Sequence, residues 1–517
     1  MRRLMVVACL FGLGALAAPN AARAADCGGL ARLKIETTNL LSAAEVPAAG
    51  DLPAYCRVLG YVRPAINFEV RLPLTGWNGK FYQAGCGGFC GTLLSDAPGF
   101  TNAINVALRR NYAVAADDSG HWGSSAVDGR WALDNPVGKA DWAWRAETET
   151  ARVGKALVKA FYGTAQSKAY FAGCSTGGRM AGVEATRFPA DFDGIIMGAP
   201  ALDYTGLVAT AFAWFAQANI GPDGKQVFGL AKLPLVRDAV LKSCKSTDGL
   251  IDDPRTCGFK PESLQCQSGD GADCLTQAEV GTLEKWYAGP RDGHGTQLYP
   301  GGLPPGSEAN WGLWLTGSST RPPAMPLFGQ DFLRYMAFVP DAGPLYTARA
   351  FDFDRDPARL APMAALYNAA TYEPATGAVQ GADLSAFAKR GGRMVVYHGW
   401  GDPLVTPYLT VAWYDAWVKA AGGMDAARGT ARLFMIPGMD HCGINPANAS
   451  ITDTGIDPLT ALEQWVEQGA APAALLATKR TAEGQTVWQR PICAYPQAAT
   501  LTGTDSKDPA AWTCAAP

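Results

Sequence analysis

Short apolar runs alternate with longer amphipathic segments over much of the chain. Seven of the runs are strand-like, at residues 66–72, 81–84, 112–116, 169–173, 194–197, 394–398 and 433–436. Helical patterns separate most of them, at residues 143–162, 408–421 and 459–468. This alternation predicts a parallel sheet covered by helices on both faces, which is an α/β fold.

The predicted strand at residues 169–173 runs directly into Gly173-Cys174-Ser175-Thr176-Gly177, and a helix-forming stretch follows. Gly-x-Ser-x-Gly between a strand and a helix is typical of the nucleophile elbow of an α/β-hydrolase. The two glycines allow a tight turn that exposes the serine above the carboxyl edge of the sheet. Ser175 is therefore the candidate nucleophile.

An acid and a base are expected after the serine, because hydrolases of this fold run Ser, then Asp or Glu, then His. Asp402 follows the predicted strand 394–398 across a glycine-rich turn, and His441 follows the strand 433–436. His441 would take the proton of Ser175 and return it to the leaving group, while Asp402 would hold the imidazole tautomer. The alternative is a turn serine, a helix-capping aspartate and a core histidine.

The alternation of strands and helices is lost between residues 202 and 366, where Gly, Pro and Trp are frequent and four cysteines occur. This segment lies between the strand after the elbow helix and the strand that leads to Asp402, so it would cover the catalytic edge as a lid. We predict an α/β-hydrolase catalytic domain made of residues 25–201 and 367–517, with a large inserted lid domain at 202–366.

The amino terminus has the features of an export signal. Two arginines precede an apolar run at residues 4–18, and Ala22-Arg23-Ala24 follows as a small-residue cleavage site. We predict a signal peptide over residues 1–24 and a secreted or periplasmic mature protein. The apolar run is shorter than a membrane span requires, and no later uninterrupted apolar run is long enough, so no membrane partner is expected.

The chain has 13 cysteines, and removal of Cys9 with the signal leaves twelve, an even number that favours six disulfides in an oxidising compartment. Local spacing suggests the pairs Cys27 with Cys56, Cys86 with Cys90, Cys244 with Cys257, Cys266 with Cys274 and Cys493 with Cys514, which leaves Cys174 with Cys442. The alternative is that some are free buried thiols or pair differently.

The charge balance excludes one class of partner. Lys and Arg number 44 against 47 Asp and Glu, a formal net charge of −3, and no run of basic residues occurs. The electrostatic footprint of a nucleic-acid binder is therefore missing. A neutral or weakly acidic small molecule is the expected partner, and the oligomeric state stays open.

The motifs together resemble the tannase and feruloyl esterase family, which includes the bacterial mono(2-hydroxyethyl) terephthalate hydrolases. The resemblance covers nearly the whole mature chain and rests on residues 77–81, 85–91, 173–179, 248–254, 399–403 and 441–442. Paired cysteines beside the nucleophile and the base are the hallmark of the family. The resemblance implies a serine esterase that acts on a small ester of an aromatic or phenolic acid, with no cofactor for catalysis.

The resemblance also implies an oxyanion hole in the glycine cluster at residues 85–91. Acyl transfer requires backbone N–H donors aimed at the developing oxyanion, and glycine lets the backbone approach closely. Gly87 would supply one donor and Thr176 the other, with Gly88 as an alternative to Gly87. An ordinary glycine turn is the competing interpretation.

Lids of the family carry a structural calcium ion, which implies Asp248, Leu250 through its carbonyl, and Asp252 as ligands here. The loop between Cys244 and Cys257 departs from the family pattern, because it is shorter and has Lys245 where the family has a further aspartate. A metal-free turn closed by the disulfide is therefore the alternative to calcium.

Three lid residues are candidates for substrate binding. Residues 328–338 have the pattern of a short amphipathic helix with Arg334 and Phe338 on one face. The family members that process terephthalate have an arginine and a phenylalanine at this spacing, which hold a substrate carboxylate and ring. Trp311 would add an aromatic wall. The alternative is that these aromatic side chains fill the core of the lid.

The leading hypothesis is a secreted carboxylic ester hydrolase of the feruloyl esterase or tannase type. A mono(2-hydroxyethyl) terephthalate hydrolase-like esterase is the closest alternative, and a peptidase of the same fold is another. A hydrolase-fold binding protein without activity is the alternative from a different class, and an assay with a generic aryl ester separates it from an enzyme.

Overall fold

The structure is a computed structural model that describes residues 26–93, 95–97, 99, 102–244, 249–318, 320–444, 451–452, 455–481 and 485–516. The predicted signal peptide, residues 1–24, lies outside the described residues.

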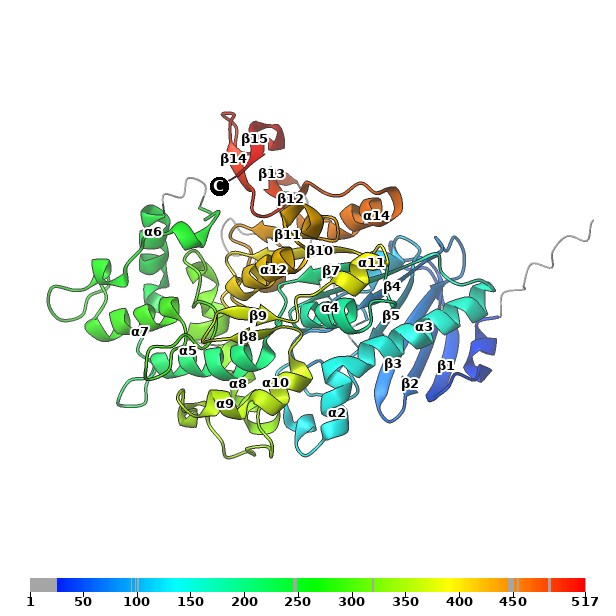
Figure 1. The fold of residues 1–517 in the computed structure, drawn as a ribbon, viewed down its shortest axis with the longest axis horizontal. Coiled ribbons are helices and arrows are strands. Elements are labelled where there is room, and N and C mark those ends of the chain that lie inside the picture. The colour runs from blue at the N-terminus through cyan, green and yellow to red at the C-terminus, as the bar shows by residue number, and fades with distance from the viewer. Residues whose placement is uncertain are drawn as a thin grey trace, which may run out of the picture.

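A nine-stranded mixed sheet forms the centre of the molecule (Figure 1). In spatial order its strands are β1 (Thr38–Val46), β2 (Tyr55–Val62), β3 (Ile66–Pro73), β5 (Ala113–Asp117), β4 (Lys80–Ala84), β6 (Lys168–Cys174), β7 (Gly194–Gly198), β10 (Arg393–Gly399) and β11 (Ala431–Ile436). The first three pairings from β1 to β5 are antiparallel, and the five from β5 to β11 are parallel. The seven strands that the sequence predicts are all present, whereas β1 and β2 were not predicted.

Helices cover both faces of the parallel strands, as the alternating pattern predicts. Alternate residues of each strand point to opposite faces, and the buried side chains accordingly form two clusters. One cluster packs the strands against α3, α4 and α12, and the other packs them against α1 and α14. These helices are α1 (Asn105–Leu108), α3 (Ala146–Tyr162), α4 (Thr176–Arg187), α12 (Tyr408–Ala420) and α14 (Pro458–Gln468). The fold is that of an α/β-hydrolase.

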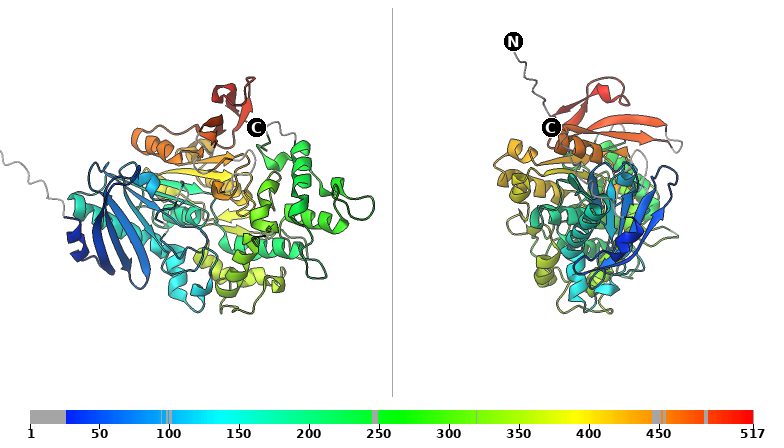
Figure 2. Two further views of the ribbon diagram at one scale, coloured as in Figure 1. Left: turned by 180° about the vertical axis from the view of Figure 1, so that it is seen from behind. Right: turned by 90° about the vertical axis from the view of Figure 1, so that its right-hand side faces the viewer.

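Between β7 and β10 the described residues add no strand to the central sheet. They form α5 (Phe212–Ala218), α6 (Leu233–Ser243), α7 (Gln277–Ala288), α8 (Ala324–Tyr335), α9 (Asp356–Arg359), α10 (Ala361–Tyr367), α11 (Ser385–Lys389), the π-helical turns η4 (Thr205–Ala211) and η9 (Gly312–Thr316), and a hairpin of β8 (Thr371–Glu373) and β9 (Ala378–Gln380). Figures 1 and 2 show most of this insertion beside the sheet, at the end opposite β1. The division into domains at residues 202 and 366 stays a prediction.

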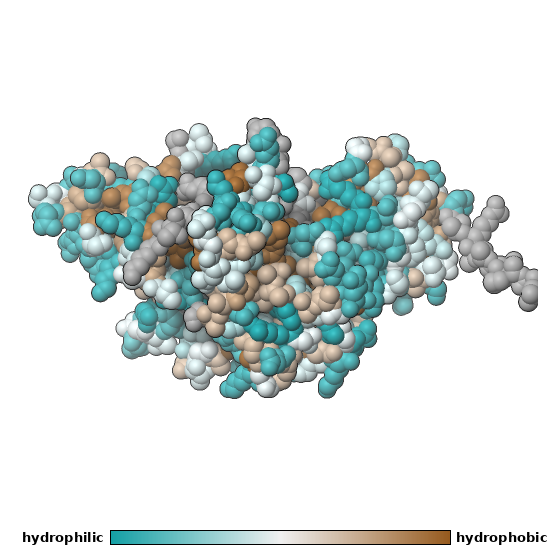
Figure 3. Space-filling model, turned by 90° about the horizontal axis from the view of Figure 1, so that it is seen from above, coloured by the Kyte–Doolittle hydropathy of each residue, from teal (hydrophilic) through white to brown (hydrophobic). Residues whose placement is uncertain are grey.

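The remaining elements lie at the periphery. Two helices, α2 (Pro136–Ala140) and α13 (Met424–Arg428), flank the core, and η3 (Asp141–Arg145) leads into α3. Two hairpins, β12 (Ala474–Arg480) with β13 (Thr486–Cys493) and β14 (Ala498–Leu501) with β15 (Trp512–Ala515), end the chain and were not predicted. On the face that carries them, hydrophilic residues surround smaller groups of hydrophobic ones (Figure 3).

All six predicted disulfides are present. They join Cys27 to Cys56, Cys86 to Cys90, Cys174 to Cys442, Cys244 to Cys257, Cys266 to Cys274 and Cys493 to Cys514. The bridge from Cys174 to Cys442 spans 268 residues of sequence. It therefore ties the end of β6 to the loop after β11.

No helix in the described part of the chain has the length and apolar character that a passage through a membrane demands.

Candidate active site

Ser175 occupies the sharp turn between β6 and α4, as the elbow motif predicts. Its backbone has φ 66° and ψ −120°, in the left-handed region that a non-glycine residue rarely adopts. The flanking glycines are required by close packing, because a Cβ atom on Gly173 would lie 2.4 Å from the carbonyl oxygen of Gly177. The N–H of Ser175 donates to the carbonyl of Gly198 on β7 at 3.0 Å, which fixes the turn to the sheet.

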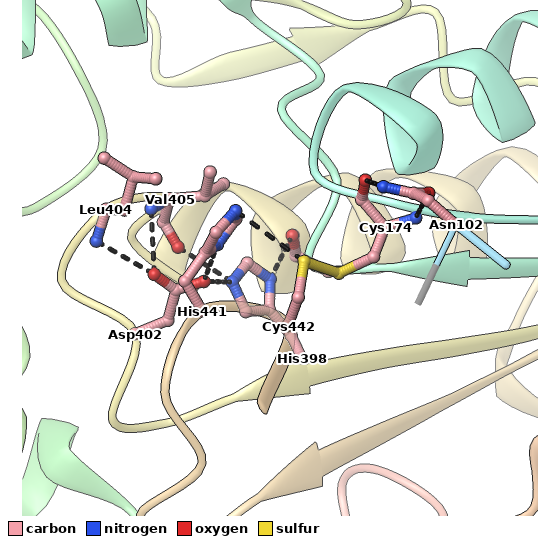
Figure 4. The surroundings of a disulfide bond; sticks show 9 residues. Asn102, Cys174, His398, Asp402, Leu404, Val405, His441 and Cys442 are labelled. Carbon is pink, nitrogen blue, oxygen red and sulfur yellow. Dashed lines mark hydrogen bonds and ion pairs between the residues drawn. A yellow bond between two sulfur atoms is a disulfide. The ribbon is translucent and has the colours of Figure 1, made fainter. Parts of the chain in front are cut away.

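Asp402 and His441 form a buried hydrogen-bonded pair (Figure 4). His441 Nδ1 lies 2.7 Å from Asp402 Oδ2, and both side chains are almost fully enclosed. The other oxygen, Oδ1, accepts from the N–H groups of Leu404 and Val405 at 2.9 Å each. These bonds hold the carboxylate so that an Nδ1–H of His441 donates to it, and Nε2 of His441, which lies 3.6 Å from Cys442 Sγ, is the nitrogen that could accept a proton.

Charges around Asp402 keep it ionised despite its burial. Burial by itself would raise the pKa of Asp402, but the charge of His441 and hydrogen bonds from His398 and His441 lower the pKa to about 2. His398 Nε2 lies 2.8 Å from the carbonyl of Val405 and 3.2 Å from Asp402 Oδ2. Both neighbours are acceptors, so His398 carries its proton on Nε2 and acts as a second donor to the carboxylate.

The disulfide brings the loop of Ser175 and the loop of His441 together. Cys174 precedes Ser175 and Cys442 follows His441, and their Cα atoms are 6.0 Å apart. No hydrogen bond joins Ser175 Oγ to His441 Nε2 in this structure. In hydrolases without substrate, the hydrogen bond between a serine and its histidine is often long or poorly aligned and tightens only in the substrate complex.

A small pocket opens at Ser175 and is lined mainly by the insertion. Its walls are formed by Gly88, Ala201, Tyr204, Leu207, Val208, Phe212, Phe328, Leu404 and Val405. Among the described residues that line it, no side chain carries a charge. The hydroxyl of Tyr204 lies 3.4 Å from Thr176 Oγ1, next to the nucleophile. The lining of the pocket is therefore largely apolar and uncharged.

The predicted oxyanion donors lie on both sides of the elbow. Thr176 is the first residue of α4, where a backbone N–H has no partner within the helix. Its hydroxyl donates to the carbonyl of Gly88 at 2.7 Å, which joins the glycine loop to the elbow. Gly88 lines the pocket of Ser175, whereas Gly87 is not among the residues found there. The choice between Gly87 and Gly88 as second donor stays a prediction.

Trp314 contacts the ring of His441 and is bonded to Asp440, a residue that was not predicted from the sequence. Trp314, in η9 of the insertion, stands edge-on to the ring of His441 at 5.6 Å between centroids. Its Nε1–H donates to Asp440 Oδ1 at 2.9 Å. Burial and the nearby charge of Asp402 raise the pKa of Asp440 well above its ordinary value. The insertion thus touches the base loop directly.

The three predicted substrate-binding residues have other contacts in this structure. Arg334 Nε donates to the carbonyl of Tyr346 at 3.1 Å, and its Nη1 lies 3.6 Å from Asp331 Oδ1. Phe338 is buried between Tyr346 and Arg359, at centroid distances of 5.5 Å and 4.5 Å. Neither Arg334 nor Phe338 is among the described residues that line the pocket of Ser175.

Trp311 is fully enclosed within the insertion. It packs edge-to-face on Trp286 at 5.1 Å, and its Nε1–H donates to Ser307 Oγ at 2.8 Å. These are the contacts of a core residue. Phe328, Tyr204 and Phe212 line the pocket instead. Of these, only Phe328 lies on the amphipathic helix that the sequence singled out.

The predicted calcium loop is held by ion pairs in the part that the structure describes. Asp252 Oδ1 accepts from Arg490 Nη2 at 2.5 Å, and Asp253 binds Arg255. The side chain of Leu250 is buried, and Asp248 lies outside the described residues. Among the described residues, no three His, Cys, Asp or Glu side chains form a cluster that could hold a metal ion. A carboxylate bound to a guanidinium does not fit a calcium shell, so the site stays a prediction without support here.

Comparison with known proteins agrees with this geometry. A family model described as tannase and feruloyl esterase matches residues 52–515. A mono(2-hydroxyethyl) terephthalate hydrolase from Piscinibacter sakaiensis is 34% identical over 91% of this chain and 86% of its own. An uncharacterized esterase from Xanthomonas campestris is 34% identical over 97% and 92%. The crystal structure of feruloyl esterase B from Aspergillus oryzae superposes with a TM-score of 0.79 at 26% identity, over 94% of this chain and 98% of that one.

The fold and the site define an α/β-hydrolase-type enzyme with a helical insertion. The chain belongs to the tannase and feruloyl esterase family. It is a carboxylic ester hydrolase.

Proposed function

We propose that the protein is an exported serine esterase that cleaves esters of aromatic or phenolic acids through an acyl-enzyme on Ser175. The observation that carries this proposal is the buried pair of Asp402 and His441, which the bridge from Cys174 to Cys442 holds beside the nucleophile elbow. Without that pair a strained elbow serine would have no base to activate it.

In this mechanism His441 Nε2 accepts the proton of Ser175 as Oγ attacks the ester carbonyl. The N–H of Thr176 and one from Gly87 or Gly88 stabilise the oxyanion of the tetrahedral intermediate. Collapse of the intermediate expels the alcohol, which receives the proton from His441. A water molecule then attacks the acyl-enzyme with His441 as base, and release of the acid restores Ser175.

The pocket supports an aromatic acyl group. Phe212, Phe328 and Tyr204 present ring surfaces near Ser175, and aromatic rings favour stacked or edge-on contacts with a flat acyl group. Charged side chains are missing from the described lining, so a second free carboxylate on the acyl group would have no charged partner there. This favours feruloyl or similar phenolic esters.

A terephthalate monoester is the second candidate substrate. The relative from Piscinibacter sakaiensis bears that activity in its name and is 34% identical to this chain. Arg334 is the predicted partner for the free carboxylate. In this structure the guanidinium of Arg334 forms an ion pair with Asp331. Binding such a substrate would require Arg334 to leave its contacts.

Export is supported by the covalent chemistry of the chain. The chain has six disulfides. Disulfides form and persist in oxidising compartments and are rare in the cytosol. The amino-terminal signal pattern points in the same direction.

A panel of pure esters tests the proposal, with kcat/KM measured for methyl ferulate, methyl gallate and mono(2-hydroxyethyl) terephthalate on the wild type and Ser175→Ala. We expect the phenolic esters to give the highest kcat/KM, and Ser175→Ala to lower kcat at least about 10³-fold with an unchanged melting curve. A clean Ser175→Ala preparation that keeps more than a few per cent of the activity would remove Ser175 from the mechanism.

A further inference from the structure

Strand β6 continues past the end of its neighbour β4, just before the nucleophile. The two strands pair in parallel up to Ala84 and Ala172, and the N–H of Gly85 donates to the carbonyl of Ala172 at 2.9 Å. Backbone groups along a strand point to the same side every second residue. The N–H and C=O of Cys174 therefore point to the side that β4 has already left, while Ser175 bonds to Gly198 on the other side.

The side chain of Asn102 occupies the place of the missing strand residue (Figure 4). Its Oδ1 accepts from the N–H of Cys174 at 2.9 Å, and its Nδ2 donates to the carbonyl of Cys174 at 3.2 Å. A carboxamide has one acceptor oxygen and an N–H donor, like a peptide group, so it completes both bonds that a strand would make. Asn102 itself has φ 50°, a left-handed conformation that asparagine tolerates better than most residues.

The amide is confined by the two glycine segments of the site. A Cβ atom on Gly177, in the first turn of α4, would lie 2.4 Å from Asn102 Oδ1. A Cβ atom on Gly87 would lie 3.3 Å from Asn102 Nδ2. The same side chain thus contacts the end of β6, the elbow helix and the predicted oxyanion loop.

We propose that Asn102 is a positioning residue for the nucleophile, acting through the backbone of Cys174. This inference rests on the proposed role of Ser175. Loss of the amide would leave the strand end without partners at the residue that precedes the strained turn. A nucleophile displaced by about 1 Å can lose about 10²-fold in rate, so the effect should fall on kcat.

The test compares Asn102→Gly with a matched control, Asn111→Gly. Both asparagines have positive φ, 50° for Asn102 and 61° for Asn111, and glycine adopts such values without strain. Asn111 lies before the first residue of β5, at the amino-terminal end of that strand, whereas Asn102 bonds to the carboxyl end of β6. We expect Asn102→Gly to lower kcat at least about tenfold, with KM within about twofold and a melting temperature close to that of Asn111→Gly. The control should keep the wild-type kcat.

A second variant, Asn102→Asp, supplies a readout that a purely structural role would not move. An ionised carboxylate accepts from the N–H of Cys174 but repels its carbonyl, whereas a protonated carboxyl has one donor and one acceptor like the amide. The kcat of Asn102→Asp relative to wild type should therefore recover as the pH falls.

Three outcomes overturn the inference: an unchanged kcat in Asn102→Gly, equal losses in Asn102→Gly and Asn111→Gly, or a pH-independent ratio for Asn102→Asp. Ser175→Ala is measured in parallel. If Ser175→Ala stays active, the proposed function itself fails, whereas an inactive Ser175→Ala with an unaffected Asn102→Gly rejects only the role of Asn102.

Discussion

The carboxylate of Asp402 receives hydrogen bonds from two histidines and two backbone N–H groups. Asp402→Asn would keep the size of the side chain and remove its charge. The amide favours the wrong tautomer of His441 and cannot stabilise its charged form, so kcat should fall by about 10⁴-fold. Steady-state kinetics at neutral pH measure this, and a loss smaller than tenfold would contradict the role of Asp402.

The same substitution should also change how the free energy of unfolding depends on pH. The pKa of Asp402 is about 2 in the folded protein, below its unfolded value of about 3.9. Its stabilising contribution is therefore present above about pH 4 and is lost as the pH falls toward 2. Asp402→Asn should be less stable than wild type at neutral pH, and the difference in the free energy of unfolding, measured with denaturant, should narrow below pH 4.

Single residues differ in how far the sequence could predict them. Ser175, Asp402 and His441 are candidates because of a short motif, strand ends and chain order, which are local signals. Asn102 bonds to a residue 72 positions away, and its role depends on where β4 ends relative to β6. No local pattern encodes that register, so sequence reasoning missed it.

At the scale of elements, α8 separates the two substrate hypotheses. Arg334→Ala should leave kcat/KM for methyl ferulate nearly unchanged. If Arg334 binds a free carboxylate, the variant should lose about tenfold or more on mono(2-hydroxyethyl) terephthalate. Because the pocket has no charged side chain in its described lining, we expect Arg334→Ala to lower kcat/KM for the two substrates by factors that differ less than about threefold. A selective loss on the terephthalate ester would establish Arg334 as its carboxylate partner.

The elements themselves were predictable where burial is complete. Strands β4 to β7, β10 and β11 are apolar runs, because helices cover both of their faces. Strand β1 is largely exposed and reads Thr-Asn-Leu-Leu-Ser-Ala-Ala-Glu-Val, and β12 to β15 are partly exposed hairpins. Half-exposed strands at an edge lack a continuous apolar signal, so these segments were missed.

At the scale of the whole molecule, an ion pair joins the insertion to the end of the chain. The ion pair of Asp252 and Arg490 links the calcium-loop segment to β13. We expect a chelator to leave the melting temperature unchanged, and added calcium to have no effect. A drop in melting temperature that calcium reverses would show that calcium binds the folded state, by mass action.

The most direct test of the account is to trap the nucleophile. Treatment with a fluorophosphonate, which phosphonylates activated serines, followed by peptide mass mapping identifies the modified residue. The account predicts one adduct per chain, on Ser175, with activity lost in proportion and no adduct in Ser175→Ala. Complete inactivation with the adduct on another residue would contradict it.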